Sequence, residues 1–408
     1  MRFEIYVALR FLREARSQTI LIITGVSVGV SVLVFLTALI GGLQQSLIAQ
    51  TLGAQPHIVV RPEEESARPM LAKRSASNEV VFSVVEKSAQ RLRSIREWQK
   101  VVHVLSDIPG VAGVSPVVLG AAFAIRGSAS RAVALYGIDP ERFEQVIPVA
   151  SKLRSGRFDV SGAFVNLGVD LADELGVKVG DKFRLGAPGA SGDVFVVSGL
   201  FDFGNKEVNL RWVLVSLRNA QTLLDLVGGA SQIFVRVDAI FAAQALSEEI
   251  AATTGLVSDS WMRTNAQLLV ALESQSRSSQ MIQLFVIVAV AMGIASVLIV
   301  SVVQKSREIG ILRAMGTSRK QVQRVFLLEG LIVGATGALF GSILGVALTL
   351  LFQALARRPD GTLLFPFELN VRLFATAAAI ALATGVCSAV LPARRAARLD
   401  PAEAIRYV

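Results

Sequence analysis

Four long apolar runs, nearly free of charge, constrain the fold of this 408-residue chain more than any other feature. They are Ser17–Val60, Ser278–Gln304, Val325–Ala356 and Leu373–Ala393. Each contains about 20 residues or more, the length that a helix needs to cross a hydrocarbon core of roughly 30 Å. Only Glu329 interrupts the third run, near its basic end, where a carboxylate is expected to lie at the interface and to cost less than at mid-bilayer. The chain is therefore predicted to cross a membrane four times.

The distribution of charge predicts how these helices are oriented. Segments 1–18, 304–324 and 392–408 carry 14 basic and five acidic residues, whereas 44–279 carries 24 of each. Loops that stay in the cytoplasm are enriched in Lys and Arg. Both termini are therefore predicted to be cytoplasmic, and 44–279 to lie on the other side. The net charge of +9 does not indicate nucleic-acid binding, because that would need basic residues on a soluble domain.

The predicted fold is a membrane protein with four transmembrane α-helices and a large extracytoplasmic mixed α+β domain between helices 1 and 2. The predicted segments are a cytoplasmic interfacial helix (1–18), transmembrane helix 1 (19–42), the extracytoplasmic, periplasmic domain (43–277), transmembrane helix 2 (278–303), a cytoplasmic coupling segment (304–324), transmembrane helix 3 (325–352), a short external loop (353–372), transmembrane helix 4 (373–391) and a cytoplasmic C-terminal tail (392–408).

The external domain has the alternating patterns of a mixed α and β fold. Strands are predicted at 57–61, 111–118, 121–125, 131–136, 182–185, 193–201, 212–216, 232–237 and 257–259, and helices at 94–107, 168–175, 217–226 and 241–254. A further helix is predicted to start near Thr264 and to continue into transmembrane helix 2, because no Pro or Gly interrupts it before Gly293. The polar stretch 63–93 is predicted to be an exposed insertion. Cys387 lies in the last apolar run, so the external domain has no disulfide.

The chain shows no constellation of residues that would carry catalysis. Its two histidines, His57 and His103, are interpreted as structural, and no set of residues has metal-ligand spacing. No phosphate-binding loop of the form G-x-x-x-x-G-K-[ST] occurs. We therefore predict that the chain is not an enzyme, and that it has no catalytic residue, no metal site and no cofactor of its own.

The cytoplasmic segment 304–324 combines six basic residues with an apolar seam at helical spacing, formed by Ile309, Leu312 and Met315. A simple positive-inside loop would explain the charge but not the seam. A short helix with an apolar seam outside the bilayer usually docks against another surface. The segment is therefore predicted to be the place where a soluble partner acts on this protein.

Glycines at four-residue spacing predict close contacts between helices. Gly25 and Gly29 form a G-x-x-x-G pattern in the first span, and Gly337, Gly341 and Gly345 line one stripe of the third. A helix without side chains along such a stripe lets a neighbouring backbone approach. These five glycines are the predicted helix-packing residues.

Two motifs resemble those of a known family, the type VII ABC permeases, a superfamily that includes FtsX, MacB-like macrolide exporters and Lol-type lipoprotein-releasing permeases. Ser306–Gly316, with the sequence SREIGILRAMG, resembles the family's coupling helix, and Pro392–Ile405 resembles its C-terminal signature. The N-terminal Ala8–Arg13 and the overall length resemble the Lol-type branch most. The order of one helix, a large external domain and three further helices is that of the family.

The resemblance implies partners and a location. Family members pair as homodimers or heterodimers in the bacterial inner membrane and bind a separate ATPase, which holds ATP and Mg. Membrane lipids and a periplasmic carrier or adaptor are further expected partners. The residues expected to couple to the ATPase are Arg307, Glu308, Ile309, Gly310, Leu312, Arg313, Met315 and Gly316.

The function that the resemblance implies is release of lipoproteins or other lipidated cargo from the inner membrane, driven by movement of the external domain. Two alternatives remain open at this point. One is MacB-like export of small molecules, peptides or glycolipids with an adaptor. The other is FtsX-like regulation of a periplasmic partner without transport.

Overall fold

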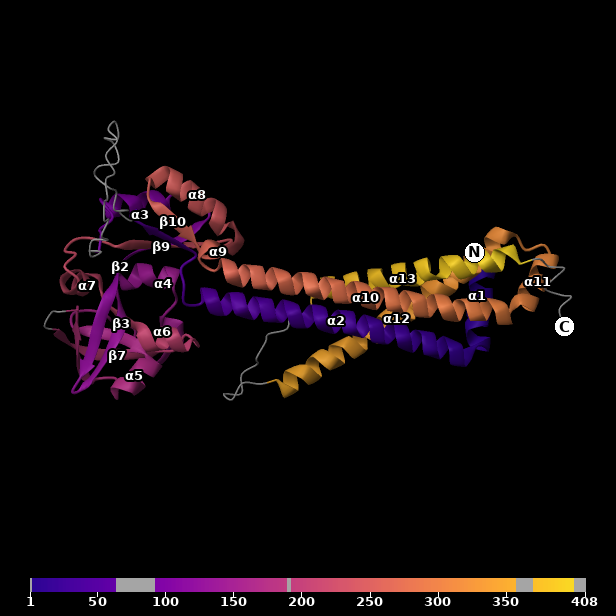
Figure 1. Cartoon of the computed structure of the whole chain (residues 1–408), viewed down its shortest axis with the longest axis horizontal. Helices are drawn as coiled ribbons and strands as arrows, with labels where there is room; N and C mark the ends of the chain where they lie inside the picture. Colours follow the sequence, from indigo (N-terminus) through magenta and orange to yellow (C-terminus); the bar gives the residue numbers. More distant parts are fainter. Residues whose placement is uncertain (1, 64–91, 189–191, 357–369, 400–408) are drawn as a thin grey trace, which may run out of the picture. The chain divides into compact units, whose positions relative to one another are not determined.

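The computed structural model describes residues 2–63, 92–188, 192–356 and 370–399. The chain divides into two compact units, one formed by Met1–Leu47 with Val270–Val408 and the other by Ile48–Leu269 (Figure 1). The predicted insertion 63–93 lies, apart from its ends, outside the described residues. The same is true of most of the predicted loop 353–372 and of the end of the predicted C-terminal tail.

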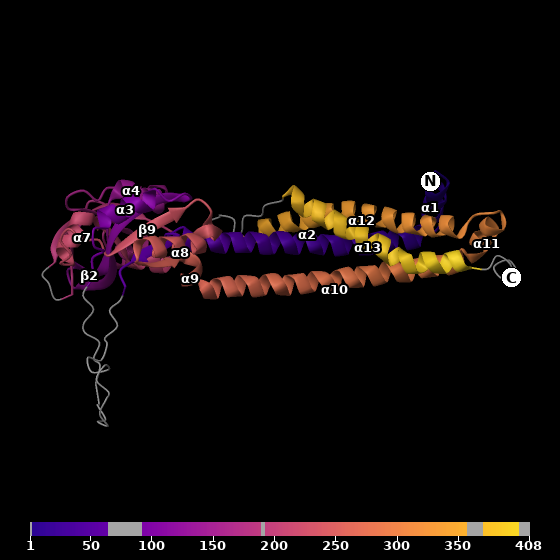
Figure 2. The same ribbon diagram turned by 90° about the horizontal axis from the view of Figure 1, so that it is seen from above.

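Most of the first unit consists of four long helices (Figure 2). They are α2 (Arg16–Leu52), α10 (Ala266–Gln304), α12 (Arg319–Leu355) and α13 (Val371–Arg398). Each is long and apolar enough to cross a membrane. Every predicted span falls inside one of them, and every helix extends beyond its span, because hydropathy marks only the apolar part of a helix. α10 starts at Ala266, close to the predicted start at Thr264.

The predicted glycine stripe of α12 lies against α2. A Cβ added to Gly341 would lie 2.6 Å from the Cβ of Val30 and 2.7 Å from the carbonyl oxygen of Ser27. Gly337 and Gly345 approach α2 in the same way, one turn to either side. Only glycine allows backbones to come this close.

The other predicted packing pair, Gly25 and Gly29, has one member in contact with a neighbouring helix and one member without such a contact. Gly29 lies directly against Val290 of α10, so that a Cβ added to Gly29 would have no room. A Cβ added to Gly25, in contrast, would meet no atom within 4 Å. Two crossing helices approach most closely at one point and diverge from it, so a single turn separates a contact from open space. Gly25 therefore does not pack against another described helix of this chain.

Two short helices lie at the same end of the bundle, α1 (Arg2–Glu14) and α11 (Ser306–Ala314) (Figure 1). The predicted interfacial helix 1–18 thus ends at Glu14, and α2 begins two residues later. α1 buries one face against the bundle, including Ala8 and Phe11, while Arg10 and Arg13 stay exposed. The N-terminal helix is therefore part of the folded bundle and not only a charged anchor.

The described residues of the second unit form a ten-stranded mixed sheet. Its strand order is β10-β1-β9-β2-β3-β8-β5-β7-β4, and β6 pairs with β2 and β7. The strands are β1 (Ile58–Arg61), β2 (Val111–Arg126), β3 (Ala129–Ile138), β4 (Leu153–Gly156), β5 (Phe164–Gly168), β6 (Lys182–Gly186), β7 (Asp193–Phe201), β8 (Trp212–Ser216), β9 (Gln232–Val237) and β10 (Val257–Ser260). The two strands predicted at 111–118 and 121–125 are one long strand, β2, which pairs with β3, β6 and β9.

Short helices connect these strands. They are α3 (Trp98–Ser106), α4 (Pro140–Val146), α5 (Val169–Leu175), α6 (Lys206–Arg211), α7 (Leu217–Leu223), α8 (Ala243–Thr254) and α9 (Trp261–Thr264), with 3-10 turns at Ala150–Lys152 and Ile240–Ala242. α5 ends as predicted at Gly176, which adopts the left-handed conformation with φ 63°. The sequence patterns missed β4, β5, α4, α6 and α9. β4 has no fully buried residue and the polar Asn166 lies within β5, so neither shows the apolar pattern that marked strands of similar length such as β1.

Both faces of the sheet are covered by apolar side chains. Successive residues of a strand point to opposite faces. Val117 and Phe234 accordingly join a cluster with α4. Of their neighbours, Val118 joins a cluster with α7, and Val235 joins a cluster with α3 and α8. The described part of the unit is thus stabilised by a core on each side of the sheet.

His57 is a titratable residue next to this core, and the fold changes its pKa. It is half-buried, and its Nδ1 atom accepts a hydrogen bond from the backbone N–H of Val237 at 3.1 Å. Burial lowers the pKa of His57 below the ordinary value of 6.5, and contact with the Val237 carbonyl only partly offsets this. The folded unit therefore holds a proton on His57 more weakly than the unfolded chain does.

We expect this imidazole to make the unit less stable in acid. Because the native pKa is lowered, its contribution is fully present above pH 6.5 and is lost as the pH falls below that value. The free energy of unfolding should fall between about pH 7.5 and pH 5.5, and by less in a His57→Gln variant. All three tryptophans lie in this unit, so denaturant titrations followed by tryptophan fluorescence report on it selectively. An equal decrease in both proteins would contradict the expectation.

Candidate functional site

The short helix α11 has defined ends. Gly316 follows it in the left-handed conformation, with φ 99°. The N–H of Gly316 donates to the carbonyl of Arg313 and that of Thr317 to the carbonyl of Leu312, both at 3.1 Å, which is the Schellman arrangement. Ser318 then caps α12. The predicted coupling segment 304–324 is therefore a helix, a tight turn and the first turn of the third long helix.

The inward face of α11 packs on the chain's own bundle. Ile309 is only 1% exposed and belongs to a cluster that includes Phe11 of α1, Phe326 of α12 and Ala396 of α13. Leu312 packs against the same cluster, and Gly310 is buried. Ile309 and Leu312 of the predicted seam thus pack inside the chain and hold α11 in place, and their expected contact with a partner stays a prediction.

Arg313 is also engaged within the chain. Its Nη1 atom donates to the carbonyl oxygen of Leu399, just after α13 ends. A cation at the carbonyl end of a helix satisfies acceptors that have no partner inside the helix. This side chain ties α11 to the end of α13, and the expected coupling of Arg313 to an ATPase stays a prediction.

The outward face of α11 carries the exposed residues. Met315 is 79% exposed and Ile311 is 44% exposed, although both are large and apolar. Arg307 and Glu308 flank them and are exposed as well. At 100° per residue, these positions and Ala314 fall within an arc of roughly 120°. This outward face of α11 therefore offers an apolar centre between charges, and Ile311, which the seam had left out, belongs to it.

Lys305 connects α11 to the N-terminal helix. Its side chain is 9% exposed and lies just before α11 begins. The Nζ atom donates to the carbonyl oxygen of Phe11 at 3.0 Å, lies 3.4 Å from an oxygen of Glu14 and sits 4.0 Å from the centre of the Phe11 ring. The Arg10 guanidinium lowers the pKa of Glu14, and Lys305 adds to that effect. We name these contacts the Lys305 latch.

Glu329 lies inside the bundle and not at an exposed interface. It is 3% exposed, and one of its carboxylate oxygens has no hydrogen-bond partner among the described residues. Its helical neighbour Gly330 packs against Gly385 of α13. Its position near the basic end of the helix could be read from the sequence, but the direction in which its side chain points depends on how α12 packs.

The described residues contain no group of three or more His, Cys, Asp or Glu side chains that could hold a metal ion. His57 bonds to Val237, and Cys387 is exposed on α13.

Family comparisons match most of the chain. Residues 19–253 match the MacB-like periplasmic core domain, and residues 281–401 match the FtsX-like permease C-terminal domain. The first match alone covers more than half of the chain, and the second contains α11. A large external domain followed by a permease part is the organisation that the sequence predicted.

Curated relatives match along nearly their full length. The lipoprotein-releasing system transmembrane protein LolC of Xylella fastidiosa is 26% identical, over 98% of this chain and 98% of the relative. LolE of Haemophilus influenzae is 25% identical, over 93% and 92%. The crystal structure of the extracellular domain of YknZ, a transporter of Gram-positive bacteria, covers 50% of this chain and 98% of its own, at 14% identity. Its TM-score of 0.34 is too low to add to the description of the fold.

These matches and the four apolar helices of the described residues describe a multi-pass membrane permease. The external unit lies between the first and second long helices, as in the matched domains. This chain therefore belongs to the FtsX- and MacB-like superfamily of ABC transporter permeases.

Proposed function

We propose that this chain is the permease subunit of an ABC transporter in a bacterial inner membrane, with both termini in the cytoplasm. A separate ATPase, which binds ATP and Mg, presses on α11 and thereby moves the extracytoplasmic unit. The movement releases lipoproteins or other lipidated cargo from the membrane. A second permease, identical or related, completes the complex.

The observation that carries this proposal is the outward face of α11. Neighbouring apolar side chains that stay exposed within a polar rim are typical of an interaction surface. Ile311 and Met315 are such side chains, and Arg307 and Glu308 beside them offer charge pairs that would orient a partner. Anchoring of the opposite face by Ile309 means that a push on α11 is transmitted to the bundle and not absorbed by a loose loop.

A path for the movement follows from the chain itself. α10 ends at Gln304 and α11 starts at Ser306, so that only Lys305 separates them. α10 is a single helix of 39 residues without a proline. Near its start, Leu269 packs into the core of the external unit. A helix of this kind resists bending and can carry a displacement along its axis.

The lipidated nature of the cargo is supported by the full-length likeness to lipoprotein-releasing permeases of both named types. The first span, 19–42, contains no charged residue, so acyl chains can lie along it without meeting a buried charge. A periplasmic carrier would then accept the released cargo.

We expect Met315→Asp, alone or with Ile311→Asp, to abolish docking of the ATPase. Loss of an apolar contact at the centre of an interface costs about 2 kcal/mol or more, which weakens binding by roughly 30-fold. Two measurements check this: co-purification of the ATPase with the permease from membranes, and ATP-dependent release of a lipidated reporter from proteoliposomes containing both.

A matched control separates docking from general damage. Val227 is 84% exposed but lies in the external unit, so Val227→Asp introduces the same charge at a similar exposure. This variant should retain the ATPase. If Met315→Asp also retained the ATPase, α11 would not be the docking element. If docking were lost as expected but the wild type released no lipidated reporter, the coupling would stand and the cargo assignment would fail.

A further inference from the structure

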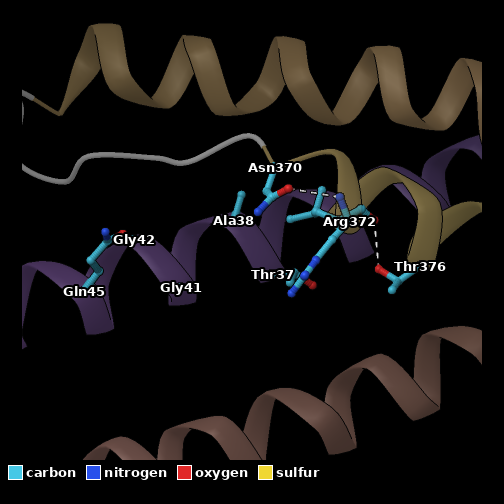
Figure 3. Close-up of a pocket in the computed structure, with 9 residues that line it drawn as sticks. Thr37, Ala38, Gly41, Gly42, Gln45, Asn370, Arg372 and Thr376 are labelled. Carbon is cyan, nitrogen blue, oxygen red and sulfur yellow. Dashed lines mark hydrogen bonds between the residues drawn. The ribbon is translucent and has the colours of Figure 1, made fainter. Parts of the chain in front are cut away.

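A cavity of about 350 Å3 lies in the helical unit, between α2 and the start of α13 (Figure 3). It takes no part in the proposed docking at α11. Its lining includes Thr37, Ala38 and Gly41 of α2 and Asn370, Arg372 and Thr376 of α13.

Small residues on α2 create the space. Ala38, Gly41 and Gly42 lie on the face of α2 that lines the cavity, between Thr37 and Gln45, and their small size leaves the space open. A Cβ added to Gly41 would meet no atom within 4 Å. Unlike the glycine stripe of α12, which brings two helices together, Gly41 leaves a volume that another molecule can occupy.

The cavity presents one positive charge and no negative charge. Arg372 is the one charged residue among the described residues that line it. In Figure 3 its side chain extends toward Thr37 on the opposite helix. The side-chain oxygen of Asn370 accepts a hydrogen bond from the backbone N–H of Arg372 at 3.2 Å. The side-chain amide nitrogen of Asn370 is left to donate to a ligand. Such a set of donors around a guanidinium suits an anion with several oxygens.

The position of the cavity along the helices restricts the anion further. It lies where the predicted span 19–42 ends and the predicted span 373–391 begins, so the polar lining comes at the edge of the apolar region. Arginines at helix ends reach toward the headgroup layer of a bilayer. Leu373 adds an apolar surface on the bilayer side of Arg372. A ligand whose phosphate group adjoins hydrocarbon chains matches this order of a polar surface followed by an apolar one.

We propose that this cavity binds the headgroup of a phospholipid, with Arg372 contacting the phosphodiester and the acyl chains running along Leu373. The ligand is a resident membrane lipid and not the transported cargo, since the diacylglyceryl anchor of a lipoprotein carries no phosphate. The inference is independent of the proposed transport function.

Two variants test the two halves of the site. Arg372→Gln removes the charge, and Gly41→Phe fills the volume without a clash. Each has a matched control on the same unit: Arg277→Gln removes an exposed arginine from α10, and Gly25→Phe places the same ring on α2 where space is also open. The full-length chain is purified in detergent and titrated with palmitoyl-oleoyl-phosphatidylglycerol, and bound lipid is counted by native mass spectrometry.

We expect Arg372→Gln to bind the lipid at least about tenfold more weakly than the wild type, the size of effect that follows from loss of one charged hydrogen bond. Gly41→Phe should weaken binding by a similar factor, because the ring occupies the cavity. Both controls should bind as the wild type does. Unchanged binding in the two site variants would overturn the proposal. So would displacement of the lipid by inorganic phosphate alone, which would indicate a free-anion site, or by a phosphate-free diacylated lipopeptide, which would make the cavity a cargo site.

Discussion

Replacing Gly341 with leucine is expected to separate α12 from α2 and to destabilise the helical unit strongly. The new Cβ would lie 2.6 Å from Val30 and 2.7 Å from the carbonyl oxygen of Ser27, and a backbone atom cannot rotate away. Overpacking costs about 1–3 kcal/mol, and this site belongs at the upper end. The midpoint of thermal unfolding in detergent should fall by roughly 5–10 °C.

A control at another glycine makes this result specific. Gly25→Leu adds the same side chain to α2, where it meets no atom within 4 Å, and should leave the midpoint within error of the wild type. The readout is the fraction of protein that remains monodisperse in size-exclusion chromatography after heating. If Gly341→Leu behaved like Gly25→Leu, the close approach of α2 and α12 would be wrong.

Lys305→Met is expected to release the N-terminal helix from the bundle. The substitution removes the hydrogen bond to Phe11, the ion pair with Glu14 and the contact with the Phe11 ring. A hydrogen bond from a charged donor contributes about 1.5–3 kcal/mol, and Glu14 is partly exposed, so its share is small. The expected cost of about 2 kcal/mol would raise the population in which α1 is detached by roughly 30-fold.

Accessibility of a buried position on α1 measures this detachment. Ala8 has no exposed surface, so a cysteine placed there by Ala8→Cys, in a Cys387→Ser background, should react slowly with a polar maleimide. Labelling should accelerate at least tenfold in Lys305→Met. Lys320→Met, at an exposed lysine of α12, is the matched control and should leave the rate unchanged. Equal rates in both variants would show that the Lys305 latch does not hold α1.

Helix positions and domain order could be predicted from the sequence, because both depend on patterns along the chain. Each predicted span lies within one long helix, and α10 starts within two residues of the predicted Thr264. Gly176 ends α5 because only a residue without a side chain adopts a positive φ at little cost. The strands that were missed, β4 and β5, lack such a pattern, because β4 has no fully buried residue and the polar Asn166 lies within β5.

The candidate site was predicted only in part, for a different reason. Ile309, Leu312 and Met315 share helical spacing, but spacing does not reveal which surface an apolar side chain meets. The fold buries Ile309 against Phe326 and leaves Met315 exposed. The sequence shows Arg313 only as one charge of a basic segment, whereas the fold places it beside the end of α13.

The sequence by itself determined that this chain crosses a membrane, how its charges divide and which family it resembles, because hydropathy, charge and local motifs are properties of consecutive residues. Only the tertiary structure decided which face of α11 is free, that Lys305 holds α1, that Glu329 is buried and that a cavity opens beside Arg372. Each of these depends on a neighbour from a distant part of the chain, and the contacts that fix such neighbours exist only once the helices have packed.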